Sequence, residues 1–489
     1  MIPIAVTEAA RVLGAELVGS DGDSGATEIT ALVADSRQAG PGTLFLALPG
    51  EHVDGHDFVD AAFAAGATAA VTAHPVQAPG PCLVVADPLV AAGRLARDQV
   101  DRGVTGGLLV TAITGSAGKT STKDLLAHLL ETAGPTVAPV GNLNNELGVP
   151  LTVCRIDART RHLVIEMGAR GTGHIGYLCT IAPPQVAAVL NVGTAHVGEF
   201  GSRAAIANAK GEIIEALPPG GTAVLNADDP MVWAMRDRTS ARPVGTGVGA
   251  EPRSEDAVWA TDVRSDSLGR CSFALSEKWR GAVADSVDVR LGLSGRHQVA
   301  NAVAAVAMAR VLGVPMPAVA SALATARPRS RWRMELTERS DRVLVVNDAY
   351  NANPESMRSA VDTVAAMLAS RPGATGWAVL GDMLELGAST GTQHQALGAY
   401  VAEHGLHRLV AVGALAEDLV AGAASAGTGL RAEVAVDSVD AAARVLAELA
   451  PGDVVLVKGS RGLALDTVAA ALMAADGDGH GHGRDEDST

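Results

Sequence analysis

The sequence predicts an α/β protein of three domains, whose central domain carries a phosphate-binding loop on a doubly wound, mostly parallel sheet. The chain has 489 residues, which is too long for a single hydrophobic core. Apolar runs of strand length alternate with segments of helical periodicity along most of it. Hydrophobic residues make up 48% of the chain but aromatic residues only 3%, so the βα units are built mainly from small aliphatic side chains. A small N-terminal α/β domain and a C-terminal Rossmann-like domain complete the predicted architecture.

The domain boundaries are placed where this alternation changes. Residues 1–104 hold short strands such as Leu44 to Leu48 and a helix near Phe58 to Ala65, and are expected to form the N-terminal domain. Residues 105–326 form the central domain, in which the polar, turn-rich stretch 251–291 suggests antiparallel strands. Residues 327–475 form the C-terminal domain, and residues 476–489, which lack an apolar face, are expected to be disordered. Four apolar runs mark the C-terminal sheet: Val343 to Asn347, Trp377 to Leu380, Leu409 to Val412 and Val454 to Val457.

A glycine-rich turn between a predicted strand and a predicted helix carries the main chemical signal. Val110 to Thr114 is apolar and β-branched, and the leucines after Lys119 recur at helical spacing. The turn between them has the form G-x-x-G-K-T, in which backbone N–H groups, the lysine and the threonine suit a phosphate chain and Mg²⁺. Ile113 stands where the usual motif has its first glycine, so the loop is a shortened one, and the alternative is a glycine turn in an ordinary βα unit. We predict an ATP site formed by Gly115, Ser116, Ala117, Gly118, Lys119, Thr120 and Ser121.

Composition and net charge limit the kinds of partner and the cellular compartment that we expect for this protein. The formal net charge of −16 argues against a general nucleic-acid or membrane binder, and no run approaches the roughly 18 apolar residues of a membrane span. Four scattered cysteines without C-x-x-C spacing suit a reducing compartment. The opening Met1-Ile2-Pro3 lacks the features of a signal peptide. We therefore expect a soluble, cytoplasmic protein without nucleic-acid partners or membrane insertion.

Unusual polar residues follow other predicted strands of the central domain. His162 to Ile165 leads into Glu166, and the strand beginning at Val186 leads into His196. Because ligands of open α/β sheets bind beyond the carboxyl ends of the strands, both residues and Thr120 are expected to converge near the γ-phosphate. A carboxylate is a preferred Mg²⁺ ligand, so Glu166 is a candidate metal ligand, whereas His196 is equally consistent with a structural histidine. The helix predicted from Ser202 to Leu217 carries Lys210, for which the residues alone suggest only a surface position.

Together these segments resemble the Mur ligase family, the ATP-dependent enzymes that add amino acids to the UDP-linked cell-wall precursor. The resemblance covers about residues 25–470. It is carried by TGSAGKTS at 114–121, Glu166-Met167-Gly168, Asn191 to His196, Ala209-Lys210-Gly211-Glu212, Gly295 to Asn301, and Asp348-Ala349-Tyr350-Asn351-Ala352-Asn353-Pro354.

Within the family, the chain is most similar to the branch that adds D-alanyl-D-alanine to UDP-N-acetylmuramoyl-tripeptide. The segments GNLNNELGVP at 141–150 and NDAYNANPESM at 347–357 have the asparagine patterns of this branch, and VLGDMLELG at 379–387 agrees. The D-N-P-R motif of the branch that adds the third, diamino residue is absent from the sequence. The alternatives are that third-residue ligase, a folylpolyglutamate-type ligase, or a nucleotide-regulated scaffold without catalysis.

The resemblance implies a mechanism and roles for individual residues. ATP would phosphorylate the terminal carboxylate of the precursor, and the dipeptide amine would attack the resulting acyl phosphate. Lys119, Lys210 and His196 would be catalytic, with Lys210 carrying a CO₂-derived carbamate that helps to hold Mg²⁺ together with Thr120, Glu166 and His196. Asn301, Arg333 and Asp348 would contact the nucleotide. The family glycine before the arginine is replaced by Trp332, which leaves open whether Arg331 or Arg333 has this role.

The resemblance also assigns the substrate site. Residues 35–59 would belong to the domain that binds the UDP-sugar, and a basic cluster at the end of the last strand would face the incoming dipeptide. The protein is expected to act as a monomer. The implied substrate-binding residues are Asp35, Ser36, Arg37, Asn144, Asn145, Asn351, Asn353, Lys458, Ser460 and Arg461.

Overall fold

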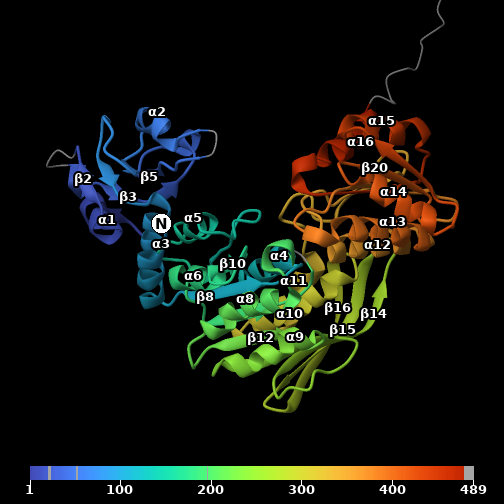
Figure 1. The fold of residues 1–489 in the computed structure, drawn as a ribbon. Helices are drawn as coiled ribbons and strands as arrows, with labels where there is room; N and C mark the ends of the chain where they lie inside the picture. Colours follow the sequence, from blue (N-terminus) through green and yellow to red (C-terminus); the bar gives the residue numbers. More distant parts are fainter. Residues whose placement is uncertain (20–23, 51–52, 195–196, 478–489) are drawn as a thin grey trace, which may run out of the picture.

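The computed structural model describes residues 1–19, 24–50, 53–194 and 197–477. Over these ranges the strands form sheets of five, nine and six strands, together with an antiparallel pair of β1 (Ile4–Ala5) and β3 (Glu28–Ile29). The three larger sheets follow one another along the chain, and the N-terminal and C-terminal parts extend from different sides of the central part (Figure 1). The predicted α/β class with a mostly parallel central sheet is confirmed.

The N-terminal sheet has the order β2-β7-β6-β5-β4, in which only the β2–β7 pair is antiparallel. The predicted strand near Leu44 is β5, and the predicted helix near Phe58 is α2. The strands are β2 (Glu16–Val18), β4 (Ala31–Val33), β5 (Thr43–Leu46), β6 (Ala69–Thr72) and β7 (Cys82–Val84), and the helices are α1 (Val6–Leu13), α2 (Val59–Ala64) and α3 (Pro88–Thr105).

The central sheet has the order β16-β15-β14-β13-β12-β11-β8-β10-β9 and is parallel from β9 to β14. The last three strands are antiparallel, as the stretch 251–291 predicted, and they extend the central sheet at one edge. Its strands are β8 (Leu109–Thr114), β9 (Thr136–Val137), β10 (His162–Glu166), β11 (Val186–Val189), β12 (Thr222–Asn226), β13 (Arg242–Val248), β14 (Ala257–Ser265), β15 (Arg270–Trp279) and β16 (Ala282–Ser294).

Helices cover both faces of the central sheet because its strands are apolar on both sides. On β10, Leu163 and Ile165 pack into one core, whereas Val164 between them packs into another. The first core lies under α3, α5 (Gly148–Val153), α6 (His174–Ile181) and α8 (Arg203–Glu215), and the second under α4 (Lys119–Leu130), α10 (His297–Val311) and α11 (Met316–Thr325). The first core also includes N-terminal residues such as Leu44, so the boundary predicted after residue 104 falls at the end of a helix shared by two parts. The short helices α7 (Val197–Phe200) and α9 (Pro230–Trp233) complete this part.

The C-terminal sheet has the order β17-β18-β22-β19-β20-β21 and is parallel except for the β17–β18 pair. The four predicted apolar runs are β18 (Leu344–Asn347), β19 (Gly376–Gly381), β20 (Arg408–Val412) and β22 (Val454–Lys458). Sequence reasoning missed β17 (Glu335–Glu338) and β21 (Arg431–Ala435), because both are edge strands of mixed polarity. The helices are α12 (Pro354–Ala369), α13 (Thr390–Glu403), α14 (Ala416–Ser425), α15 (Ser438–Glu448) and α16 (Asp466–Gly477).

The chain end differs in part from the prediction. Asp476 and Gly477, assigned to the disordered tail, are the last residues of α16, and Asp476 accepts hydrogen bonds from the N–H and hydroxyl of Ser340. Residues 478–489 lie outside the described residues. Among the helices that the structure describes, none has both the length and the apolar character needed to cross a lipid bilayer.

Candidate active site

The predicted phosphate loop forms the turn from β8 into α4. Gly118 has a φ of +82°, and a Cβ there would lie 2.3 Å from Asn301 Oδ1, so both the backbone conformation and the space require glycine. Helix α4 begins at Lys119, which leaves the first N–H groups of the helix available to an anion. The Lys119 Nζ donates to the Gly115 carbonyl at 2.8 Å, and burial lowers the pKa of this amine while the Glu166 carboxylate raises it. The turn therefore has the geometry of an anion site.

The end of β11 fixes the shape of this loop. Asn191 accepts from Ser116 N at 3.1 Å through its carbonyl and from Ala117 N at 2.8 Å through its Oδ1, and its Nδ2 donates to the Ala117 carbonyl. Gly193 N donates to Ser116 Oγ at 2.9 Å. The hydroxyl of Ser121, the last predicted loop residue, accepts weakly from Gln298 Nε2 at 3.5 Å. The loop is thus held by contacts with the ends of neighbouring elements.

A cavity of about 490 Å³, here called the reaction cavity, lies between the central and C-terminal parts. The structure brings together in its wall Thr120 and Glu166, two of the three residues that the strand ends were expected to bring together, and Lys210, which only the family resemblance placed with them. The C-terminal part contributes the opposite wall. The lining includes Ser116 to Ser121, Asn144, Asn145, Arg333, Tyr350, Asn351, Asn353, Ser460 and Arg461.

Glu166 is a buried carboxylate at the end of β10. Its Oε2 accepts from Thr120 Oγ1 at 2.9 Å, and its Oε1 accepts from Asn144 Nδ2 at 2.7 Å. Strand β10 pairs with β8, so Glu166 lies directly beside the strand that leads into the loop. A carboxylate next to a threonine hydroxyl and a phosphate loop is the donor set that Mg²⁺ prefers. These residues therefore fit that ion.

Lys210 is a buried lysine on α8 and not the surface residue that the bare sequence suggested. It is 5% exposed, and within the described ranges its amine has neither a hydrogen bond nor an ion pair. Burial lowers the pKa of the Lys210 amine well below its usual value, and the positive charge of Lys119 lowers it further. A neutral amine facing the reaction cavity is the form that can react with CO₂. His196, the remaining predicted metal ligand, lies outside the described residues.

A second cavity of about 470 Å³, the adjoining cavity, lies on the other side of the loop. Gly118, Asn301, Asp348 and Lys458 line it, and Arg333 lines both cavities. Within the part of the chain that the structure describes, three atoms of its lining residues are buried and have no hydrogen-bond partner: His297 Nδ1, Arg333 Nε and Glu355 Oε2. Buried polar atoms without partners are costly, so their presence in one wall favours a polar ligand here.

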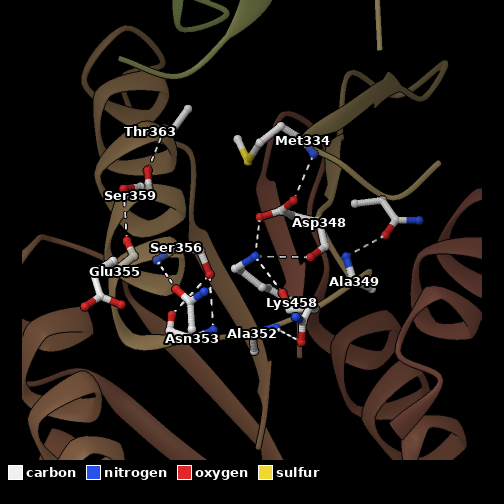
Figure 2. A network of polar contacts seen from close by, with 12 residues as sticks. Met334, Asp348, Ala349, Ala352, Asn353, Glu355, Ser356, Ser359, Thr363 and Lys458 are labelled. Carbon is white, nitrogen blue, oxygen red and sulfur yellow. Dashed lines mark hydrogen bonds and ion pairs between the residues drawn. The ribbon is translucent and has the colours of Figure 1, made fainter. Parts of the chain in front are cut away.

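Asp348 and Lys458 form a buried pair in the adjoining cavity (Figure 2). The Asp348 Oδ2 accepts from Lys458 Nζ at 2.5 Å, and its Oδ1 accepts from Met334 N at 3.0 Å. Lys458 also donates to the Asn351 carbonyl at 3.0 Å. The sequence grouped Lys458 with Ser460 and Arg461 as a dipeptide site, but the structure separates it from them, because Lys458 faces the adjoining cavity while the other two line the reaction cavity.

Of the two arginines that the sequence left open, Arg333 is the one that lies at the cavities. Its guanidinium carbon lies 4.1 Å above the Tyr350 ring, and its NH2 group lies 3.4 Å from Thr120 Oγ1, whereas Arg331 is exposed and lines neither cavity. Trp332, which replaces the family glycine, has a φ of +58°, a conformation that favours glycine. The Arg461 guanidinium carbon lies 4.0 Å above the Trp332 ring, so the tryptophan supports one wall of the reaction cavity.

The predicted asparagines have several local roles. Asn145 Oδ1 accepts from Gly148 N at the start of α5, and Asn353 caps α12 by accepting from Ser356 N. Asn301 Nδ2 donates to Gln298 Oε1, and Ser460 Oγ accepts from Leu384 N. Each of these residues lies on the wall of one of the cavities as well.

The predicted UDP-sugar residues lie in the N-terminal part and line neither cavity. Asp35 caps the short 3₁₀ turn Ser36–Gln38, and its carboxylate makes a two-point ion pair with the exposed Arg37. Their role stays a prediction.

Sequence reasoning missed two contributors to the site. Glu355, in the first turn of α12, contacts the loop after β11 from another part of the chain, and only its place in a family segment could have drawn attention to it. The stacking of Arg461 on Trp332 depends on a tertiary contact between residues far apart in sequence, and Trp332 was noted only as a departure from the family pattern.

These features define a class of protein. It is a phosphate-loop α/β protein in which the reaction cavity and the adjoining cavity share one loop and both contain buried ionisable groups. Family models agree with that class and narrow it. The Mur ligase middle domain matches residues 113–309, the Mur ligase glutamate ligase domain matches 332–461, and the Mur ligase family catalytic domain matches 28–100. The chain belongs to the Mur ligase family, as its motifs predicted.

Relatives match nearly the full length. The UDP-N-acetylmuramoyl-tripeptide–D-alanyl-D-alanine ligase of Mycobacterium tuberculosis is 44% identical over 97% of this chain and 99% of its own, and that of Escherichia coli is 36% identical over 96% and 99%. A crystal structure of MurF from Acinetobacter baumannii superposes with a TM-score of 0.84 at 32% identity, covering 96% of this chain and 99% of the other. MurF ligase from Thermotoga maritima in complex with ADP gives a TM-score of 0.76 at 28% identity, over 92% and 98%.

Proposed function

We propose that this protein is an ATP-dependent ligase that joins D-alanyl-D-alanine to UDP-N-acetylmuramoyl-tripeptide through an acyl phosphate, releasing ADP and phosphate. The observation that carries the proposal is the reaction cavity, in which the phosphate loop, Glu166 and Lys210 face residues of the C-terminal part. The full-length similarity to ligases of this name supports the choice of substrates.

The first chemical problem is to bring two anions together. The carboxylate of the tripeptide must approach the γ-phosphate of ATP, so positive charge is needed where they meet. Lys119 at the start of α4 and the guanidinium of Arg333 line the same cavity and supply that charge. Phosphoryl transfer needs mainly alignment and electrostatic stabilisation, which a loop fixed by Asn191 provides.

Glu166, Thr120 and Lys210 would hold Mg²⁺ in this cavity. The bound ion would neutralise phosphate charge during transfer. Glu166 is already hydrogen-bonded to Thr120, and Lys210 has a lowered pKa, so its amine is suited to accept CO₂ and become an anionic carbamate. The family-implied ligand His196 completes the proposed set.

The second step needs the dipeptide amine to meet the activated carbonyl. Arg461 and Ser460 lie on the wall opposite Glu166, where Arg461 could bind the dipeptide carboxylate. Placing both substrates in one cavity converts attack into an effectively intramolecular step, worth about 7–11 kcal/mol in favourable cases. Asp35, Ser36 and Arg37 would bind the UDP end in the N-terminal part. We place the reaction in the cytoplasm, where its nucleotide substrate is available.

The experiment is to incubate the protein with ATP, UDP-N-acetylmuramoyl-tripeptide and D-alanyl-D-alanine and to identify the product by mass spectrometry. We expect the pentapeptide precursor and one phosphate per product. Replacing the tripeptide precursor and D-alanyl-D-alanine by UDP-N-acetylmuramoyl-dipeptide and a diamino acid tests the third-residue ligase. Replacing them by a folate substrate and glutamate tests the folylpolyglutamate-type ligase. Phosphate release with either of those pairs, and none with D-alanyl-D-alanine, would reject the proposal.

A further inference from the structure

Glu355 connects the C-terminal part to the phosphate-loop side of the adjoining cavity. Its Oε1 accepts from Thr194 N at 2.7 Å and from Thr194 Oγ1 at 2.9 Å. The contact is so close that a Cβ on Gly193 would lie 2.8 Å from this oxygen and 3.2 Å from Ser116 Cβ in the loop. The carboxylate of Glu355 therefore lies beside the loop that would hold the phosphates.

The second oxygen of this carboxylate differs from the first in having no partner among the described residues. Glu355 Oε2 is buried and makes no hydrogen bond to the part of the chain that the structure describes, although Glu355 lines the adjoining cavity. In Figure 2 the carboxylate points away from the hydrogen bonds that cap α12 and from the Asp348–Lys458 pair. A buried acceptor without a donor is costly, and a ligand donor in the cavity would remove that cost.

The neighbouring carboxylate does not offer the same possibility. Both oxygens of Asp348 are engaged within the protein, one by Met334 N and one by Lys458 Nζ. On the C-terminal wall of this cavity, as far as the structure describes it, Glu355 is therefore the carboxylate with an unused acceptor.

The chemistry of a nucleotide selects the donor. A carboxylate repels phosphates, whereas hydroxyl groups donate to it, and the hydroxyls nearest to a nucleotide's phosphates are those of the sugar. We infer that Glu355 Oε2 accepts a hydrogen bond from a ribose hydroxyl of the bound nucleotide, while Oε1 holds the loop after β11. This inference rests on the proposed use of ATP and adds a nucleotide-binding residue to it.

The test measures the affinity of ADP, 2′-deoxy-ADP and 3′-deoxy-ADP by calorimetry with excess Mg²⁺, without the peptide substrates. For the wild type, loss of the contacted hydroxyl should weaken binding about tenfold or more, since hydrogen bonds to charged groups are worth roughly 1.5–3 kcal/mol. In Glu355→Ala that penalty should fall below about twofold, because the acceptor is gone.

Two further variants separate this role from structural effects. Thr194→Val removes one bond to Oε1 but leaves Oε2, so it should keep the wild-type penalty. Glu355→Gln keeps an oxygen for Thr194 and replaces the charged acceptor by a neutral group, so its penalty should be intermediate; it serves as the test if the alanine variant does not fold.

The inference is overturned if Glu355→Ala keeps the wild-type penalty, or if neither deoxy nucleotide binds the wild type more weakly than ADP does. It is also overturned if Glu355→Ala instead removes a difference in affinity between ADP and inosine diphosphate, because these two nucleotides differ only in the base. Failure of the wild type to bind ADP at all would reject the proposed function, and this inference with it. If the wild type binds ADP and Glu355→Ala shows the same loss of affinity for the deoxy nucleotides as the wild type, only the inference is rejected.

Discussion

The two cavities on either side of the phosphate loop each contain a buried lysine, and the lysines differ in their partners. Lys458 in the adjoining cavity is paired with Asp348 and also donates to backbone carbonyls. Lys210 in the reaction cavity is as deeply buried, but among described residues its amine has no such partner. Burial lowers the pKa of both amines, while the Asp348 carboxylate raises that of Lys458.

This difference separates a structural charge from a reactive group. A buried ion pair compensates much of its desolvation cost through attraction and hydrogen bonds. A buried lysine without a partner remains costly unless it is neutral, and a neutral amine is a nucleophile. The comparison therefore supports our proposal that Lys458 has a structural role in the wall of the adjoining cavity, whereas Lys210 takes part in the reaction.

The largest effect on the reaction is expected from Lys119, which lies on the loop between the two cavities. Lys119→Ala removes the charge that meets the phosphates, so kcat for ADP formation should fall by at least about 10²–10³-fold. The measurement is a coupled assay on the purified variant, with circular dichroism as the control for folding. Retained turnover by a folded variant would show that the nucleotide does not bind at this loop.

The next effect tests the reactive lysine. Lys210→Ala should lose activity by about 10²-fold or more, because the proposed carbamate ligand is lost. Added acetate should restore part of the rate by placing a carboxylate in the space left by the side chain, and the Lys119→Ala variant should gain nothing from acetate. Full activity of Lys210→Ala would contradict the carbamate role.

Replacement of the paired lysine, Lys458, should lower the stability of the protein, whereas replacement of Lys210 lowers its activity. Lys458→Met leaves Asp348 buried without its cation and should destabilise the protein by about 3–5 kcal/mol, as measured by urea unfolding. The double variant Asp348→Asn/Lys458→Met leaves no uncompensated charge and should recover much of that loss. If the double variant is as unstable as the sum of its parts, the pair is not the source of the stability.

The two lysines also illustrate which features of the site could be predicted from the sequence and which could not. The loop, Glu166 and the apolar strands could be predicted, because local spacing and strand ends determine where they lie. The burial of Lys210 was missed, although Ile206, Ile213 and Ile214 stand four residues before, three after and four after it, a spacing that places this lysine on the apolar face of its helix. The separation of Lys458 from Arg461 also escaped prediction, because alternate strand residues point to opposite faces and the turn after β22 redirects the chain.

A smaller effect concerns pH. The pKa of Lys210 is lowered by burial, so between that lowered value and the ordinary value near 10.4 the unfolded chain binds a proton that the folded chain does not. The free energy of unfolding therefore rises with pH across this window. In CO₂-free buffer, Lys210→Met should be more stable than the wild type at neutral pH, and this advantage should shrink as the pH rises. A difference that does not change with pH would indicate a packing effect.

The smallest effect is expected at Trp332, beside the arginine that lines both cavities. Its positive φ costs about 1 kcal/mol for a residue other than glycine, and its ring supports Arg461 through a cation–π contact worth about 0.5–1 kcal/mol. Trp332→Gly should therefore fold at least as stably as the wild type, while KM for D-alanyl-D-alanine rises about two- to fivefold and KM for ATP stays unchanged. Trp332→Phe keeps a ring under Arg461 and should retain the wild-type KM. A rise in KM for ATP with an unchanged KM for D-alanyl-D-alanine in Trp332→Gly would show that the residue acts through Arg333, and so on the nucleotide rather than on the dipeptide.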